Sequence, residues 1–366
     1  MQARDGGVAM GVNEARHRWV DAAKGLSIIL VVLAHTAHWV DFAGIPTGPV
    51  LDAVNHSAGA VRMPLFFLAS GLFAGRWMLV SWRRLANDKL APLVWVFLLW
   101  QVAMFGYKYL AAVVLPDQQD TGLADHLLRV LVAPLRPNAE LWFLWALVVF
   151  FIGARLVVHW NRWATLAVFT AVSLLWSTAV YPLLGGAGQR LLGPGLGTFP
   201  MFFVFFIVGA LFRDRILAVV EGVAWWVAAL VAGAWIVAFP VLHLDAVVRF
   251  PGAVFVGQVI GIIAGISAAV LLARVRPITY LGERTLPVYL SHTTFVVVIA
   301  CALYLAGVSV DSPLALAIPP LIALAAIALG LLLYRFTAGT VLFRAPDWFR
   351  VRDDRAVTAD ASDSSR

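Results

Sequence analysis

WVDAAKGLSIILVVLAHTAHWV, residues 19–40, has the length and much of the composition of a membrane-spanning helix. Its middle is a run of apolar side chains, as contact with lipid hydrocarbon requires. Four ionisable residues interrupt this pattern, two near the first end and two well inside: Asp21, Lys24, His35 and His38. Because an ionisable side chain inside a membrane is costly, each of the four is a candidate functional residue.

The rest of the chain has a similar composition. Of its 366 residues, 62% are hydrophobic and 13% are charged, and the mean hydropathy is +0.88. Soluble globular proteins contain about 25% charged residues, so the sequence predicts an all-α, polytopic integral membrane helical bundle. At about 20 apolar residues per span, we expect about ten transmembrane helices. They lie at about 25–42, 57–75, 90–108, 141–158, 164–184, 198–212, 223–243, 251–273, 286–308 and 315–335.

The chain divides into three parts. We expect a cytoplasmic tail at 1–18, a membrane domain at 19–335, and a cytoplasmic, partly disordered tail at 336–366. In one outer loop, residues 123–132 are amphipathic and suit a helix on the membrane surface. The glycine-rich outer stretch 185–200 is typical of irregular chain.

The net charge of +7 reflects membrane topology. With the N-terminus inside, 21 of the 27 lysines and arginines fall in cytoplasmic segments. This bias predicts a multi-pass protein of the cell membrane with both termini in the cytoplasm. The expected partner is therefore membrane lipid rather than nucleic acid. Cys301 is alone and the eight histidines lack metal-ligand spacing, so we expect neither a disulfide nor a metal site.

A helical projection places the four ionisable residues of the first span on one face. At 100° per residue, with Asp21 at zero, Lys24 falls at about 300°, His35 at about 320° and His38 at about 260°. Lys24 and His35 are thus about 16 Å apart along the axis. Separate structural explanations exist: an interfacial ion pair for Asp21 and Lys24, a hydrogen bond to another helix for His35, and solvation for His38. Their shared face instead favours one polar stripe from the cytoplasmic surface to the bilayer interior.

The second span, within VRMPLFFLASGLFAGRW (61–77), carries Arg62 about one turn from its outer end and Ser70 near the same face. Helix packing explains Ser70, whereas a guanidinium at that depth requires an acceptor or an anionic ligand. Arg76 begins a basic cytoplasmic patch. Topology alone explains such a patch, but its charge also suits a nucleotide phosphate.

Two later segments carry further polar groups. Glu140 precedes LWFLWAL (141–147) at the outer start of the fourth span, where a carboxylate commonly caps a helix. In GERTLPVYLSHT (282–293), Tyr289 and His292 share one face of the ninth span. A tyrosine near an interface is common, but a second intramembrane histidine is a candidate functional residue.

Four segments together resemble the membrane-bound acyltransferase 3 family in order and spacing: WVDAAKGLSIILVVLAHT, RMPLFFLASGLFAG, LWFLWAL and LGERTLPVYLSHT. The similarity spans about residues 19–335 and is greatest to carbohydrate O-acetyltransferases, including the fucose 4-O-acetylase-like branch. Its most specific parts are the basic residue and histidine separated by ten residues, here Lys24 and His35, and the phenylalanine-rich segment ending in Ser-Gly. Lysine stands where many members have arginine, which keeps the charge but loses the bidentate fork.

This resemblance implies a membrane enzyme of roughly ten helices. It would move an acyl group, usually acetyl, from cytoplasmic acyl-CoA to a hydroxyl of a glycan, a lipid-linked sugar or a small molecule, without a metal. His35 would act as general base, although an acyl-histidine intermediate stays open. We assign three residues to catalysis: His35, Asp21 and Glu140. We assign four to the acyl-CoA donor: Lys24, Arg76, Tyr289 and His292. We assign four to the acceptor: Arg62, Trp142, His38 and Ser70.

Two other functions fit a polytopic protein. A transporter could use intramembrane histidine, aspartate and arginine as a relay. No internal repeat is visible, and the polar stripe stops at mid-membrane, which argues against that function. A non-catalytic scaffold would leave the buried Arg62, His35 and His292 unexplained.

Overall fold

The computed structural model describes residues 17–116, 122–137, 139–242, 250–308 and 316–351. Every regular element in these ranges is a helix, and several are long and apolar enough to cross a membrane. The predicted all-α, polytopic membrane fold is therefore confirmed. Residues 1–16 and 352–366 of the two predicted tails, 1–18 and 336–366, lie outside the described residues.

A helix is present at each of the ten predicted spans. They are α1 (Arg18–Phe42), α2 (Gly48–Gly71), α5 (Ala91–Val114), α7 (Trp142–Leu156), α8 (Arg162–Leu175), α10 (Gly185–Leu211), α12 (Trp225–Leu242), α14 (Ala253–Leu272), α16 (Thr285–Leu305) and α17 (Ile318–Thr337).

The ten helices differ in how well they suit a membrane. Seven helical segments of the described chain are long and apolar enough to span it, and the bent pair of α11 (Arg213–Glu221) and α12 would make an eighth. Helix α7 has 15 residues and is shorter than a usual span. Helix α2 contains Asp52, His56 and Arg62, and α1, α10 and α14 pack around it.

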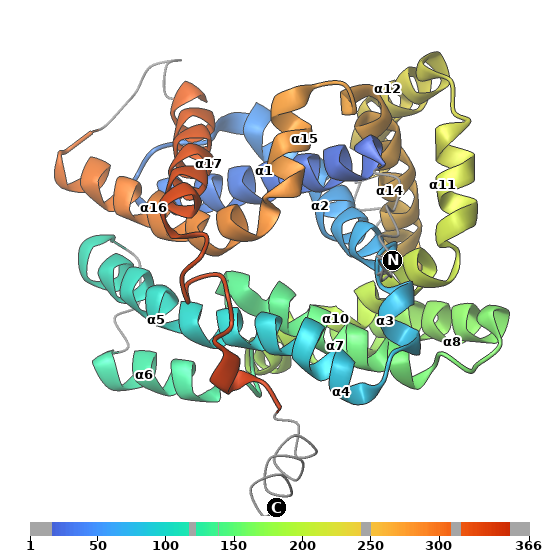
Figure 1. Cartoon of the computed structure of the whole chain (residues 1–366). Helices are drawn as coiled ribbons and strands as arrows, with labels where there is room; N and C mark the ends of the chain where they lie inside the picture. The colour runs from blue at the N-terminus through green and yellow to red at the C-terminus, as the bar shows by residue number, and fades with distance from the viewer. Residues whose placement is uncertain (1–16, 117–121, 138, 243–249, 309–315, 352–366) are drawn as a thin grey trace, which may run out of the picture.

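Helix α1 is central to one part of the bundle. It packs against α2, α14, α16, α17 and the short α15 (Arg276–Glu283). In Figure 1, α5, α7, α10 and α8 form a second group beside this one. The groups join where α2 packs on α10 and α16 packs on α5.

Glycines allow the closest helix contacts. A Cβ at Gly282 of α15 would lie 1.8 Å from the carbonyl oxygen of Asp21, so α15 rests directly on the first turn of α1. A Cβ at Gly71 would lie 2.0 Å from the carbonyl oxygen of Phe206, which fixes the approach of α2 to α10. Any side chain at either position would force the helices apart.

The prediction of irregular chain at 185–200 is wrong. These residues are helical, with one break at Gly193, whose φ is 67°. Arg136 donates hydrogen bonds of 2.5 Å to the carbonyl oxygens of Arg190 and Leu191, just before the break. In a membrane the backbone must bond internally, so even a glycine-rich segment forms a helix when a side chain satisfies the break.

The predicted amphipathic helix is present as α6 (Gly122–Val132). Leu127, Leu131 and Arg129 are exposed, and Arg129 pairs at 2.6 Å with the half-buried Asp125. Its position at a membrane surface stays a prediction.

The first and last described residues lie at the same end of the bundle. His17 and Lys89 line one cavity, and Val351 is hydrogen bonded to Asn87, two residues from Lys89.

Candidate active site

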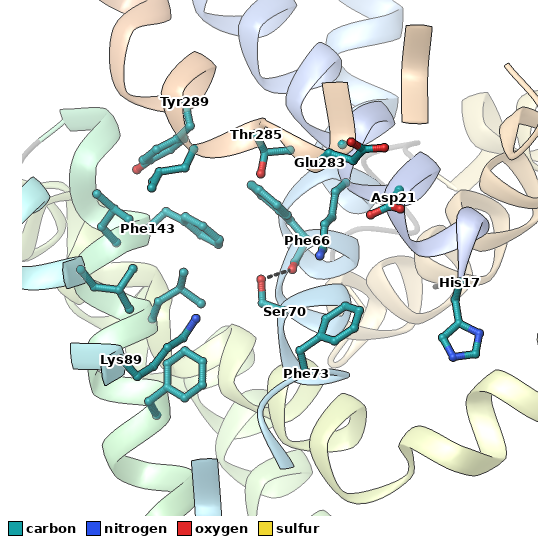
Figure 2. A pocket seen from close by; sticks show the side chains of 17 residues that line it. His17, Asp21, Phe66, Ser70, Phe73, Lys89, Phe143, Glu283, Thr285 and Tyr289 are labelled. Atoms are coloured by element: carbon teal, nitrogen blue, oxygen red, sulfur yellow. Dashed lines mark hydrogen bonds between the residues drawn. The ribbon is translucent and has the colours of Figure 1, made fainter. Parts of the chain in front are cut away.

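A cavity of about 740 Å3 opens between the two groups of helices. We call it the lysine cavity; α1, α2, α7, α15, α16 and the region around the start of α5 supply its lining. Its polar side chains are His17, Asp21, Lys24, Ser70, Lys89, Glu283, Thr285 and Tyr289. Figure 2 shows Lys89 on the opposite wall from Asp21, Ser70 and Glu283, with Tyr289 and Phe143 toward one end.

Positive side chains converge on this cavity. The Lys24 ammonium lies 4.4 Å from the ring centroid of Phe73, and the Lys89 ammonium lies 4.8 Å from that of Phe151. Lys89 repels both Lys24 and Arg76 electrostatically. Because like charges close together are unfavourable, this arrangement suits an anionic ligand.

Arg76 belongs to a neighbouring hollow. It lines a smaller cavity of about 410 Å3 together with Arg213 and Asp214. Its guanidinium lies 5.1 Å from the ring centroid of Trp77. Arg76 therefore does not line the lysine cavity, and it acts on the cavity only through its electrostatic effect on Lys89.

A second polar group surrounds Glu140, which is 8% exposed. Oε1 of Glu140 lies 3.8 Å from Nδ1 of His35 and 4.0 Å from Nζ of Lys108. The Tyr107 hydroxyl donates to the same carboxylate, at Oε2. We call Glu140, His35, Lys108, Tyr107 and His292 the histidine cluster. It draws on α1, α5, α16 and the 3-10 turn η2 (Ala139–Leu141).

His292 is held in one orientation. Its Nδ1 lies 2.7 Å from the Tyr289 carbonyl oxygen and 3.1 Å from that of Val288. Carbonyl oxygens only accept, so Nδ1 carries the proton, and Nε2 accepts from the Thr293 hydroxyl at 3.1 Å. The ring centroid of His292 is 5.3 Å from that of His35, so a fixed imidazole lies beside the candidate base.

Tyr289 connects the two regions. Its side chain lines the lysine cavity, and its hydroxyl donates to the backbone carbonyl oxygen of Glu140. A ligand that reaches the inner end of the cavity therefore meets the residue that holds Glu140 in place.

Arg62 lies near the histidine cluster and has unused hydrogen-bonding capacity. It is close enough to His35 for the two to interact electrostatically. Within the described ranges, its buried Nη1 has no hydrogen-bond partner. A buried guanidinium without an acceptor is costly, which suits an anionic or oxygen-rich ligand.

The structure thus separates the predicted stripe into three locations. Asp21 and Lys24 line the lysine cavity, and His35 belongs to the histidine cluster. Asp21 is 14 residues from His35, about 21 Å along α1. Asp21 therefore lines the cavity and is too far from His35 to contact the candidate base. His38 is exposed, with its ring centroid 5.0 Å from that of Phe42.

The remaining predicted residues have packing contacts. Trp142 lies 5.9 Å from both Phe67 and Phe202, centroid to centroid. Ser70 lines the lysine cavity, but its hydroxyl donates to the Phe66 carbonyl oxygen of its own helix at 2.8 Å. Their assignment to an acceptor stays a prediction.

The sequence reasoning missed two residues, Tyr107 and Lys108, and placed Lys89 only within the basic cytoplasmic patch that begins at Arg76. Lys108 could have been found, because it is a cation at the end of the long apolar run of the third span. Tyr107 carries no comparable signal in the sequence. In the described part of the chain, no group of three or more His, Cys, Asp or Glu side chains could hold a metal ion.

Comparison with known proteins identifies one matching family. The family model of the acyltransferase domain (acyltransferase 3) matches residues 17–335, which include the lysine cavity and the histidine cluster. Neither a curated protein nor a solved structure matches the chain.

Proposed function

The chain belongs to the acyltransferase 3 family and is a membrane acyltransferase, and from this we propose that it acylates a carbohydrate or glycolipid hydroxyl. Acyl-CoA is the donor, with acetyl as the acyl group, as in the fucose 4-O-acetylase-like branch. The protein lies in the cell membrane with both termini in the cytoplasm, in keeping with the distribution of lysine and arginine.

One observation carries this proposal: the lysine cavity ends at Tyr289, which is bonded to Glu140, and Glu140 lies beside His35. A cationic site for a phosphate-bearing donor thus adjoins a histidine–carboxylate pair. Such a pair is a recurrent arrangement for general-base catalysis.

The donor occupies the lysine cavity. Lys24 and Lys89, with Arg76 behind them, hold the phosphates of CoA, and Asp21 and Glu283 limit the positive charge at the mouth. The pantetheine arm runs past Phe143 toward Tyr289, which brings the thioester to the histidine cluster. Helix α1 spans the same path, because Lys24 and His35 are about 16 Å apart along it.

His35 carries the chemistry. Glu140 faces Nδ1 of His35, so Nε2 accepts the proton of the acceptor hydroxyl as its oxygen attacks the thioester carbon. The tetrahedral intermediate collapses with cleavage of the carbon–sulfur bond. The thiolate of CoA then takes the proton back from His35 and leaves as the thiol.

The acceptor approaches His35 from the side of Arg62 and Lys108. Side chains of His35 and Lys108 are 32% and 33% exposed, so both remain accessible although they lie within the bundle. Arg62 holds either an acceptor oxygen or the oxyanion of the intermediate. His38 and Trp142 contribute to the acceptor side of the site.

Isotope transfer tests this proposal. Membranes with and without the protein are incubated with acetyl-labelled acetyl-CoA, and glycans and lipids are analysed by mass spectrometry. We expect protein-dependent, alkali-labile label in a carbohydrate or glycolipid fraction. Absence of such label, with substrate flux in proteoliposomes lacking acyl-CoA, would contradict the proposal and favour a transporter.

A further inference from the structure

Lys89 stands on an unusual piece of helix. Residues Ala86–Leu90 form a π-helix, η1, between α4 (Trp82–Leu85) and α5. A π-helical turn accommodates one more residue than an α-helical turn and changes the direction in which its side chains point. Lys89 reaches the lysine cavity from this turn, so the geometry of the turn sets the position of its ammonium.

The turn is bonded to the far end of the described chain. The Asn87 side-chain amide donates to the Val351 carbonyl oxygen at 3.1 Å, and the Val351 N–H donates to Asn87 Oδ1 at 2.8 Å. One side chain thus pairs with both backbone groups of one residue, which fixes both distance and orientation. Residues 341–351 form what we call the C-terminal strap.

The strap is anchored along α5 before it reaches Asn87. The indole N–H of Trp100 donates to the Leu342 carbonyl oxygen at 2.9 Å, and that of Trp95 donates to the Val341 carbonyl oxygen at 2.6 Å. The ring centroid of Trp95 then lies 5.2 Å from that of Phe349. The strap therefore follows α5 from its middle to the turn that carries Lys89.

Charge explains why this turn needs support. Lys24, which lines the same cavity, and Arg76 both repel the Lys89 ammonium electrostatically, so holding it at the cavity has an electrostatic cost. A flexible turn would let Lys89 move away, and a ligand would then have to bring it back at a cost in affinity.

We propose that the C-terminal strap, through Asn87, holds the π-helical turn so that Lys89 is preorganised for the phosphates of the acyl-CoA donor. Asn87 and Val351 are positioning residues, and the inference rests on the proposed donor. The strap thereby links residues 341–351 to donor affinity, without contributing to the chemical step.

Backbone chemistry provides the sharpest test. Val351→Pro removes the N–H that donates to Asn87, and Arg350 has φ −94° and ψ 151°, a conformation that a following proline accepts. Val351→Ala keeps the N–H and is the matched control. We expect Val351→Pro to raise the Kd for CoA about fivefold, with kcat unchanged, and Val351→Ala to bind as the wild type does.

A double variant shows whether the effect passes through Lys89. In a Lys89→Gln background, Val351→Pro should weaken CoA binding no further. Asn87→Ala should reproduce the effect of Val351→Pro. Asn161→Ala, which removes the side chain that accepts from Trp163 N and Ala164 N at the start of α8, should not.

Equal CoA affinity for Val351→Pro and Val351→Ala would overturn the inference. So would a Val351→Pro effect that persists in the Lys89→Gln background. Failure of the wild type to bind CoA would instead overturn the donor assignment, and this inference with it. Binding is measured by calorimetry on the full chain in lipid nanodiscs.

Discussion

The lysine cavity and the histidine cluster adjoin at Tyr289, but their charged side chains are arranged differently. In the cavity, Lys24 and Lys89 line an open space together with the carboxylates of Asp21 and Glu283. In the cluster, Glu140 already has Lys108, Tyr107 and His35 around it. The charged groups of the cavity therefore surround a space that can admit a ligand, whereas those of the cluster contact one another within the chain.

This contrast implies a division between binding and chemistry. Substitutions in the cavity should change the KM for acyl-CoA, and substitutions in the cluster should change kcat.

Replacement of His35 should have the largest effect. His35→Ala removes the proton acceptor, and we expect kcat to fall by about 100- to 10,000-fold. His159→Ala is the matched control, because it removes an exposed imidazole that does not line the lysine cavity, and it should leave kcat nearly unchanged. Acetyl transfer by purified protein measures both. Equal losses of kcat in the two variants would contradict the role of His35 as general base.

Glu140→Gln should have the next largest effect. The amide keeps the shape of the side chain but loses the charge that faces Nδ1 of His35. We expect kcat to fall by about 100-fold with an unchanged KM for acyl-CoA, since the carboxylate orients the base and stabilises its protonated form. Steady-state kinetics check this. An intact kcat would mean that the carboxylate has only a structural role.

Two lysines allow the comparison to be tested directly. Lys89→Gln should raise the KM for acetyl-CoA about tenfold with little change in kcat, because the charge-assisted contact that we propose between Lys89 and a CoA phosphate would be lost. Lys108→Gln should lower kcat and leave that KM unchanged, because Lys108 contacts Glu140. If both lysines changed the same kinetic constant, cavity and cluster would not have separate roles.

Tyr289→Phe should have the smallest effect. It removes the hydroxyl that donates to the backbone of Glu140 but keeps the ring in the cavity wall. One hydrogen bond corresponds to about a fivefold loss in kcat. Measuring the KM for acetyl-CoA in parallel shows whether the substitution affects donor binding or the chemical step. A change in KM alone would place Tyr289 with the cavity only.

Much of the fold could be predicted because a membrane-spanning helix can be recognised from the amino-acid composition of its own segment. Each of the ten apolar runs coincides with a helix, and the projection of α1 placed Lys24 and His35 on one stripe. The error at 185–200 arose because glycine content was read as it would be in water. In a membrane, backbone bonding outweighs the low helix propensity of glycine.

The site itself could be predicted only in part. A helical projection gives the face on which His35 lies, but it does not show which neighbouring helix that face meets. Glu140 and Lys108 reach His35 from two other segments, through packing that depends on the whole bundle. The bond between Asn87 and Val351 joins residues 264 positions apart, which no local pattern indicates.

The central claim is that donor binding and catalysis reside in adjoining but separate regions. It is tested most directly by measuring acetyl-CoA binding to the His35→Ala variant in nanodiscs by calorimetry. The account predicts that this variant has lost acyl transfer yet binds acetyl-CoA with the Kd of the wild type. Loss of binding together with activity, or transfer that persists without His35, would contradict it.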